Sequence, residues 1–262
     1  MQLKDKVALI TGSTTGVGEA IARRYAQEGA KVMIHGRRQH EAEEVVKAIV
    51  DAGGEADFHL AALDNPDDCA ALVEATAARF GAINILVNNA AAITRSNIET
   101  TDVATFDFTI NVNVRAPMLL IQAAMPHFRR QGGGRVLNIG SINGYCGEAN
   151  QLAYSISKGA LTTLSRNLAD AHAAENILIN HFNLGWILTP NEYQLKIKEG
   201  LPPDWPSQIP KAFAPSGRIL APEEIAHYAV TFVSDAGGPV SGAVVELEQY
   251  PIIGRNPVKS GD

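Results

Sequence analysis

The stretch KVALITGSTTGVGEAIARRYAQEGAKVMIHG, residues 6–36, decides the fold of this chain. Its first apolar run ends at Gly12 and predicts a short buried strand. Residues 17–30 then show the spacing of an amphipathic helix, and residues 31–36 form a second apolar run. A strand, a helix and another strand in immediate succession predict two parallel strands joined by a crossover helix.

The same alternation continues to the end of the chain. Further strands are predicted at 55–63, 83–90, 134–141, 177–185 and 242–248, and further helices at 40–54, 66–81, 102–132, 152–176 and 222–235. Since no linker, repeat or low-complexity segment separates these elements, residues 1–262 are expected to form a single domain. We therefore expect an α/β fold, with a doubly wound parallel sheet of about seven strands and helices on both faces.

One segment interrupts the alternation. Residues 191–218 contain five of the 13 prolines and show weak periodicity. An excursion of this length within a compact domain is usually functional. We expect a lid over a substrate pocket at about residues 190–218, with an irregular surface insertion as the alternative.

Composition and charge exclude several classes of function. Hydrophobic residues make up 46% of the chain, and the net charge is −6, which argues against partners such as nucleic acid or a membrane surface. The two cysteines form no CxxC pair and the seven histidines no HExxH motif, so no metal site is expected. The chain shows neither a signal-peptide region nor an apolar run of membrane-spanning length, which predicts a cytoplasmic protein.

The glycines of TGSTTGVG, residues 11–18, lie at the first strand-to-helix turn. Gly12 permits a tight turn, Gly16 lets backbone approach a phosphate, and Gly18 lets the helix pack close to the strand. The helix start offers free N–H groups to an anion, so this turn predicts a dinucleotide site rather than a glycine-rich turn without a ligand. The predicted contacts are Gly12, Ser13, Thr14, Thr15, Gly16, Val17 and Gly18.

The end of the second predicted strand indicates which dinucleotide binds. NAD-binding chains usually place an acid there, but no Asp or Glu occurs between Lys31 and His40. Arg37 and Arg38 stand at that place instead, and a guanidinium suits the 2′-phosphate of NADP. We expect NADP rather than NAD; the alternative is that both arginines only solubilise a helix start.

Four motifs now stand in order: TGSTTGVG at 11–18, NNAA at 88–91, GS at 140–141 and YSISK at 154–158. In this combination, residues 5–250 resemble the short-chain dehydrogenase/reductase family. The resemblance implies a Rossmann fold and an NAD(P)-dependent oxidoreductase that acts on carbonyl or alcohol groups.

Tyr154 and Lys158 lie four residues apart on a predicted helix and therefore share a face. A nearby ammonium is expected to lower the pKa of the phenol and make it a better base. The resemblance implies that Tyr154 is the general acid/base and that Lys158 also holds the nicotinamide ribose. It further implies that Ser141 orients the reacting oxygen and that Asn113, rather than Asn111, holds a water behind the lysine.

The resemblance implies further cofactor contacts. Two departures from the family pattern stand among them, since Ala91 replaces a glycine and Leu184 a proline. The usual acid at the adenine is Ala62 here, so Leu63 or Asp64 is expected to substitute. The implied contacts are Leu63, Asp64, Asn89, Ala90, Gly185, Ile187 and Thr189, together with Tyr154 and Lys158.

Polar groups and flat apolar side chains are mixed in the predicted substrate region, as in sites that bind sugars. We expect a small polar carbonyl/alcohol pair of sugar or polyol type, contacted by Asn143, Cys146, Trp186 and Glu192. One alternative, a 3-oxoacyl-[acyl-carrier-protein] reductase, shares every motif. A second alternative is a non-catalytic NADP(H)-sensing regulator, against which the intact set of Ser141, Tyr154, Lys158 and Asn113 argues. The family resemblance also implies a homotetramer assembled through the helices near 102–131 and 152–175, and the tail 248–262 is expected to reach a neighbouring subunit.

Overall fold

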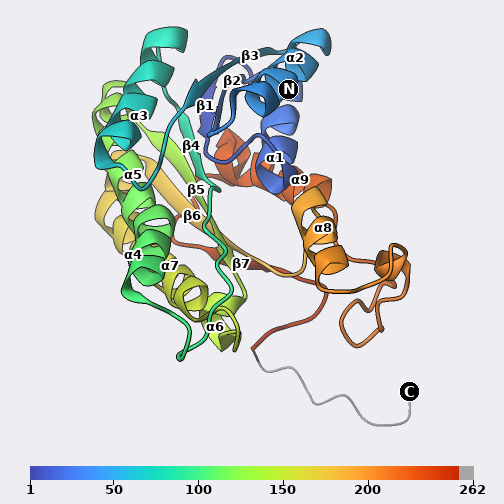
Figure 1. Cartoon of the computed structure of the whole chain (residues 1–262). Coiled ribbons are helices and arrows are strands. Elements are labelled where there is room, and N and C mark those ends of the chain that lie inside the picture. Colours follow the sequence, from blue (N-terminus) through green and yellow to red (C-terminus); the bar gives the residue numbers. More distant parts are fainter. Residues whose placement is uncertain (254–262) are drawn as a thin grey trace.

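Seven parallel strands form the centre of the molecule, in the order β3-β2-β1-β4-β5-β6-β7 (Figure 1). The computed structural model describes residues 1–253. The strands are β1 (Val7–Ile10), β2 (Lys31–Gly36), β3 (Glu55–Leu60), β4 (Ile85–Asn88), β5 (Gly134–Ser141), β6 (Ile177–Leu184) and β7 (Val244–Leu247). The predicted doubly wound parallel sheet is thus confirmed.

Helices cover both faces of the sheet and enclose two apolar cores (Figure 1). One core packs α1, α2 and α9 against the sheet, and the other packs α3, α5 and α7. The α-helices are α1 (Gly16–Gln27), α2 (Gln39–Asp51), α3 (Pro66–Phe80), α4 (Val103–Ile110), α5 (Ala116–Arg130), α6 (Asn143–Cys146), α7 (Leu152–His172), α8 (Pro190–Lys198) and α9 (Pro222–Val233). A π-helical turn, η1 (Asn111–Arg115), and 3₁₀ turns η2 (Ala173–Glu175), η3 (Trp205–Ser207) and η4 (Asp235–Gly237) complete the set.

The order of the strands places the site. The chain runs outward from β1 to β3, then crosses back to β4 on the other side of β1 and continues to β7. In sheets of this kind, ligands bind at the carboxyl ends of the strands, where the order reverses. The carboxyl ends of β1 and β4 lie at that reversal, and the glycine turn follows β1 directly.

The range 102–132, predicted as one helix, is interrupted by the π turn η1. The Ala116 N–H donates to the Asn111 carbonyl, one residue further back than in an α-helix. Pro117 lies in the first turn of α5. Proline is tolerated there, because a backbone N–H in the first turn of a helix has no partner within that helix. The widened turn carries Asn113, and π turns of this kind are frequent at functional sites.

The segment expected to be a lid contains a helix that its weak periodicity did not predict. Helix α8 begins directly after Thr189, whose hydroxyl accepts a hydrogen bond from the Glu192 N–H at 3.1 Å, and Pro190 occupies its first turn. The chain then runs through η3 to Arg218 without a further α-helix. This segment projects beside the sheet, where α8 stands apart from the other helices (Figure 1).

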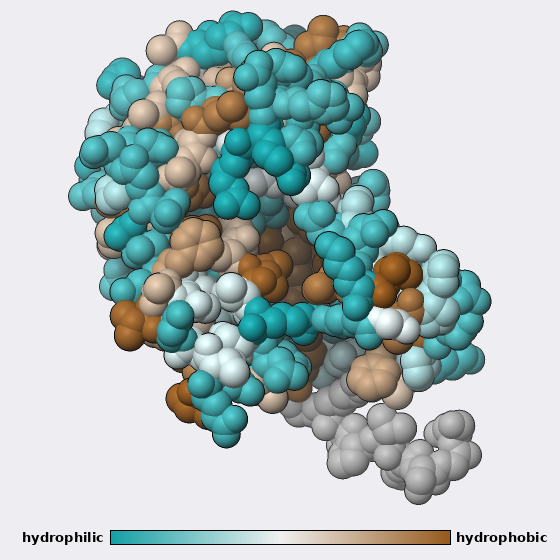
Figure 2. Space-filling view, viewed as in Figure 1, coloured by the Kyte–Doolittle hydropathy of each residue, from teal (hydrophilic) through white to brown (hydrophobic). Residues whose placement is uncertain are grey.

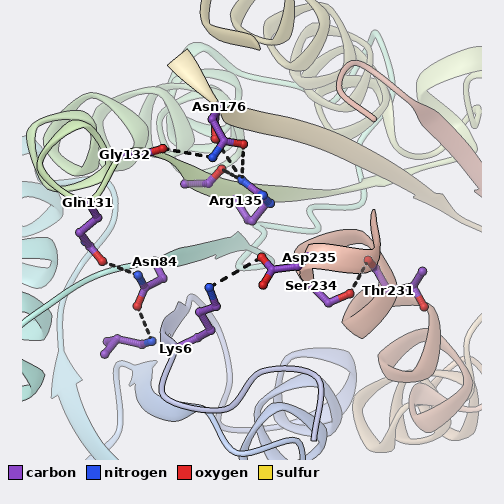
Figure 3. Close-up of polar contacts among 11 residues, drawn as sticks. Lys6, Asn84, Gln131, Gly132, Arg135, Asn176, Thr231, Ser234 and Asp235 are labelled. Carbon is purple, nitrogen blue, oxygen red and sulfur yellow. Dashed lines mark hydrogen bonds and ion pairs between the residues drawn. The ribbon is translucent and has the colours of Figure 1, made fainter. Parts of the chain in front are cut away.

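Polar side chains tie together the amino ends of the strands (Figure 3). The side-chain oxygen of Asn84 accepts from the Val7 N–H at 2.8 Å, and its side-chain amide donates to Gln131. Arg135 donates to the Asn176 backbone carbonyl at 3.0 Å, and Lys6 lies 3.7 Å from the Asp235 carboxylate. All of these residues except Val7 line a cavity of about 110 Å³. Its polar groups are mostly paired with one another, which indicates a structural role.

No helix among residues 1–253 is long and apolar enough to cross a membrane. In the same range, no group of three or more His, Cys, Asp or Glu side chains is arranged to hold a metal ion.

Candidate active site

The turn after β1 is built around three glycines at positions where a side chain would strain the backbone or crowd its neighbours. Gly12 has φ +63° and Gly16 φ +60°, in the left-handed region that favours glycine. A Cβ added at Gly12 would lie 2.8 Å from the Ala90 Cα, and one at Gly18 would lie 2.3 Å from the Gly12 carbonyl oxygen. Close backbone packing therefore fixes the shape of a cradle that a dinucleotide phosphate fits.

Asn89 and Ala90, after β4, brace this turn. The Asn89 amide donates to the carbonyls of Thr11 and Gly12, each at 3.0 Å. The backbone N–H groups of Asn89 and Ala90 both donate to the Thr11 hydroxyl, at 3.0 and 3.1 Å. These two residues, predicted as cofactor contacts, therefore hold the phosphate turn against the neighbouring strand.

His35, which the sequence did not single out, supports the turn from β2. Its Nδ1 accepts from the Gly12 N–H at 3.0 Å, so Nε2 carries the hydrogen and donates to the Ala61 carbonyl at 3.2 Å. Burial lowers the pKa of His35 to about 4, so the imidazole is neutral near pH 7. Ser13 is fully buried and bonds His35 and Ile10, so its N–H and its hydroxyl are both used inside the protein.

Arg37 and Arg38 lie exposed just beyond β2, on the same rim as the glycine turn. A Cβ added at Gly36 would lie 2.4 Å from the Thr14 methyl, which places Thr14 beside the end of β2. Arg38 forms an ion pair with Glu41 at 2.6 Å, whereas Arg37 has no ion-pair partner among residues 1–253. One guanidinium is therefore free at this rim, and the other is held by an exposed carboxylate.

Tyr154 and Lys158 lie buried on α7, with the Lys158 Nζ 5.5 Å from the centroid of the tyrosine ring. Lys158 donates to the Ile139 carbonyl at 2.7 Å, and Ser141 at the end of β5 hydrogen-bonds the phenol. Burial raises the pKa of Tyr154 to about 12, a shift that the Ser141 hydrogen bond opposes. Burial also lowers the pKa of Lys158 to about 8.

Burial therefore outweighs the lowering expected from Lys158, and the pKa of the phenol lies above, not below, that of free tyrosine. Loss of hydration disfavours the phenolate more strongly than the neighbouring groups favour it. The phenol is protonated near pH 7, and the lysine, whose pKa is about 8, carries its charge there. The arrangement is a proton donor beside a buried ammonium.

Asn113 connects the loop after β4 to helix α7. Its oxygen accepts from the Ala92 N–H at 2.7 Å, and its amide donates to the Ala92 carbonyl at 3.0 Å and the Ser157 hydroxyl at 2.9 Å. Ser157 in turn donates to the Tyr154 carbonyl at 2.6 Å. Asn113 is buried, whereas Asn111 is not. Asn113 thus contacts the amino-terminal part of α7 through Ser157.

Comparison with known proteins decides the family. A match to the family described as short chain dehydrogenase covers residues 6–200. The chain belongs to this family. A cis-4-hydroxycyclohexanecarboxylate dehydrogenase from Sinomonas cyclohexanicum is 34% identical, over 93% of this chain and 95% of that protein. A 3-oxoacyl-[acyl-carrier-protein] reductase from Thermotoga maritima is 29% identical, over 95% of this chain and 98% of that protein.

Solved structures agree with this membership. The L-sorbose reductase of Gluconobacter frateurii, complexed with NADPH and L-sorbose, superposes with a TM-score of 0.89. It is 28% identical, and the match covers 95% of this chain and 97% of that chain. This short-chain dehydrogenase is accordingly a dehydrogenase/reductase that acts on alcohol or carbonyl groups.

The segment after β6 faces the glycine turn at the carboxyl ends of the strands. A Cβ added at Gly16 would lie 3.2 Å from the Thr189 methyl, so this segment faces the glycine turn. A Cβ at Gly185 would lie 1.9 Å from the Glu248 carboxylate, which also accepts from the Trp186 N–H at 2.9 Å. Glu248 therefore fixes the chain beside Ile187, and no sequence motif had indicated this.

Leu63 and Asp64, predicted at the adenine, follow β3. Leu63 is buried, and its carbonyl accepts from the Cys69 thiol at 3.6 Å. The Asp64 carbonyl accepts from Arg115, while its carboxylate is exposed. Of these two side chains, only that of Asp64 is exposed.

The four predicted substrate residues lie in two groups. Asn143 and Cys146 lie on α6, directly after Ser141, and the Asn143 amide donates to Gln151 at 2.9 Å. Trp186 and Glu192 lie on the other wall, where the indole N–H donates to the carboxylate at 2.8 Å. Figure 2 shows a hollow beside α8 with apolar atoms at its floor and hydrophilic side chains along its rim.

Aromatic side chains hold the segment that carries α8. Trp186 stacks on Trp205 with ring centroids 5.6 Å apart, and Tyr193 stacks on Trp205 at 6.3 Å. Trp205 is 2% exposed, so the stack anchors η3 against α8. A second cavity, of about 420 Å³, is lined by Leu188, Thr189, Pro190, Tyr193, Gln194 and Pro206.

Proposed function

We propose that this protein is an NADP(H)-dependent oxidoreductase that interconverts a carbonyl and a secondary alcohol on a small polar substrate of sugar or polyol type. The observation that carries the proposal is the meeting of Ser141, Tyr154 and Lys158 at the carboxyl edge of the sheet, beside the glycine turn. A bound nicotinamide dinucleotide supplies or accepts the hydride.

The residues of the chain supply the proton and the charge stabilisation. In reduction, the Tyr154 hydroxyl donates its proton to the carbonyl oxygen of the substrate, and Ser141 donates a hydrogen bond to the same oxygen. The Lys158 ammonium stabilises the phenolate that results, because it lies beside the ring in a buried site. In oxidation, the phenolate takes the alcohol proton, and the same ammonium favours that state.

Arg37 and Arg38 support the preference for NADP. Both guanidinium groups lie at the rim where the turn meets the end of β2, and Arg37 has no competing carboxylate among the described residues. The sorbose reductase that this chain is similar to is complexed with NADPH.

We infer that residues 190–218 act as a substrate lid, with Trp186 and Glu192 on the lid side and Asn143 and Cys146 on the opposite wall. The support is the aromatic stack and the polar rim of the hollow (Figure 2). The named relatives are a cis-4-hydroxycyclohexanecarboxylate dehydrogenase, a 3-oxoacyl-[acyl-carrier-protein] reductase and an L-sorbose reductase. Because the substrates in these names differ, the proposed substrate class rests on the side chains of the two walls.

The test is a screen that follows the absorbance of reduced nicotinamide, with both cofactors and with sugars, polyols and keto-thioesters. The proposal expects turnover of a sugar or polyol with NADP(H). Turnover of acetoacetyl thioesters alone would favour the second candidate, a 3-oxoacyl-[acyl-carrier-protein] reductase, which the similarity to the Thermotoga maritima enzyme supports.

We also infer a cytoplasmic homotetramer. Exposed apolar side chains on the helices expected to form the interface support this assembly: Val103, Phe108, Met118 and Ile156. Most of the tail predicted to reach a neighbouring subunit, residues 254–262, lies outside the described residues. Sedimentation of the full chain and of a chain that ends at Gln249 tests both ideas; an unchanged assembly would remove the role of the tail.

A further inference from the structure

An ion pair joins two segments that are far apart in the sequence, the loop after β4 and the end of α8. The Arg95 Nε lies 2.9 Å from the Glu199 carboxylate, and the two side chains are 36% and 33% exposed. Arg95 belongs to the loop between β4 and α4, and Glu199 directly follows α8. The pair therefore connects the loop after β4 with the end of α8, the helix that lies beside the hollow in Figure 2.

Arg95 is fixed to the catalytic wall by its neighbour. The Ser96 N–H donates to the Asn150 carbonyl at 2.9 Å, and the Ser96 carbonyl accepts from the Leu152 N–H at 3.0 Å. Leu152 is the first residue of α7, two residues before Tyr154. The backbone of Arg95 thus cannot move away from the wall that holds the reacting groups.

Glu199 keeps a cation even when Arg95 leaves it. Lys196 Nζ lies 2.8 Å from the Glu199 carboxylate and 4.0 Å from that of Glu192, which is held by Trp186. The Lys196 hydrogen bond is the main cause that lowers the pKa of Glu199, and Arg95 contributes least. Within residues 1–253, Arg95 itself has no other ion-pair or hydrogen-bond partner. An exposed pair of this kind adds little stability, so its carboxylate is readily exchanged.

We propose that Arg95 is a specificity-determining residue that exchanges the Glu199 carboxylate for a carboxylate of the substrate. The inference rests on the proposed function and narrows its substrate class to hydroxy acids or keto acids with polar groups between the acid and the reacting carbon. A guanidinium binds a carboxylate through two parallel hydrogen bonds, which fixes the substrate in orientation as well as in place. After the exchange Arg95 is paired with the substrate carboxylate, and Glu199 is still paired with Lys196.

The kinetic test compares an acid and a neutral substrate of about the same size, D-gluconate and D-sorbitol, each oxidised with NADP⁺. We expect the acid of the pair to be preferred by the native chain. Arg95→Ala should raise KM for the acid roughly 10- to 100-fold, with kcat and the neutral substrate changed about 2-fold at most. Arg79→Ala is the matched control, since Arg79 pairs with Asp57 at 2.6 Å with 47% and 38% exposure, away from the cleft.

Tryptophan fluorescence provides a readout that needs no turnover. Both tryptophans of the chain, Trp186 and Trp205, stack beside α8. Titration of the NADP⁺-loaded protein with D-gluconate should give a saturable change that D-sorbitol does not give, and Arg95→Ala should abolish it. Glu199→Gln, which weakens the competing partner, should shift the gluconate midpoint to lower concentration.

The outcomes separate this proposal from the proposed function. An equal response to acids and neutral matches in both readouts, or an Arg95→Ala protein that behaves like the native chain, would overturn the role of Arg95. Loss of turnover on every sugar, polyol and hydroxy acid, with the gluconate response and its dependence on Arg95 intact, would overturn the proposed function alone.

Discussion

Polar side chains lie at both ends of the sheet, but the groups that they are positioned to contact differ. At the amino ends of the strands, Asn84, Arg135 and Asn176 pair mainly with one another and with backbone (Figure 3). At the carboxyl ends, Tyr154 and Lys158 are buried at a crevice where the strand order reverses. The cavity at the amino ends shows that an enclosed polar space does not by itself mark a site. What distinguishes the carboxyl ends is a set of groups positioned for a ligand.

The largest effect should come from removing the proton donor at the carboxyl edge. Tyr154→Phe keeps the ring packing but deletes the hydroxyl, and general acid–base groups contribute roughly 10²- to 10⁴-fold in rate. We expect kcat to fall by that amount while NADPH binding and the melting temperature stay near those of the native chain. A variant that retains native kcat would contradict the assignment of Tyr154.

The second-largest effect should be a loss of unfolding free energy at acid pH, caused by His35 near the carboxyl end of β2. The pKa of His35 is lowered to about 4 from an unfolded value near 6.5, so the unfolded state takes up the proton first as pH falls. The stability that neutral His35 contributes is present above pH ~6.5 and is lost as pH falls to ~4, up to about 3 kcal/mol. Denaturant unfolding of the native chain and His35→Gln across this range measures it.

His181 also has a pKa lowered to about 4 by burial, so His35→Gln should remove only part of the pH dependence. An unfolding free energy of His35→Gln that changes with pH as steeply as the native one would contradict a neutral His35.

The choice of cofactor offers a smaller effect at the same edge. Arg37→Ala combined with Arg38→Ala removes both guanidinium groups from the rim expected to hold the 2′-phosphate. We expect the affinity for NADP to fall roughly 10- to 100-fold and that for NAD to change little, because charge-assisted hydrogen bonds are lost only for the phosphate. Calorimetric titration with both dinucleotides checks this; equal losses would indicate a general effect of charge.

The smallest effect should come from the amino edge. Asn84→Ala leaves the Val7 N–H without its side-chain acceptor and should cost about 1 kcal/mol of unfolding free energy. We expect the loss to be the same at pH 4 and pH 7, with kcat unchanged. A fall in kcat that exceeds the loss of folded protein would show that the amino edge is not purely structural.

Much of the fold was predictable because its signals are local. Short apolar runs bounded by glycines predicted all seven strands, and the Tyr154–Lys158 spacing predicted a shared helix face, which the structure confirms. Helix α8 was also predictable, since Thr189, Pro190 and Glu192 form a recognisable helix start. The weak periodicity that follows concealed it.

The site's supporting contacts were not predictable, because they join residues distant in the sequence. Asn113 bonds Ala92 and Ser157 across 21 and 44 residues, and His35 bonds Gly12 across 23. The pKa of Tyr154 could not be predicted from spacing either, since burial, a property of the packed fold, outweighs the neighbouring charge.

Hydrogen–deuterium exchange of the full chain, with and without saturating NADPH, tests most directly that the dinucleotide binds at the carboxyl ends of the strands. We predict slower exchange in peptides that cover 11–18, 36–38 and 185–190, and unchanged exchange around Asn84, Arg135 and Asn176. Protection centred on those amino-edge residues, or no protection at the glycine turn, would contradict the placement of the cofactor and of the chemistry beside it.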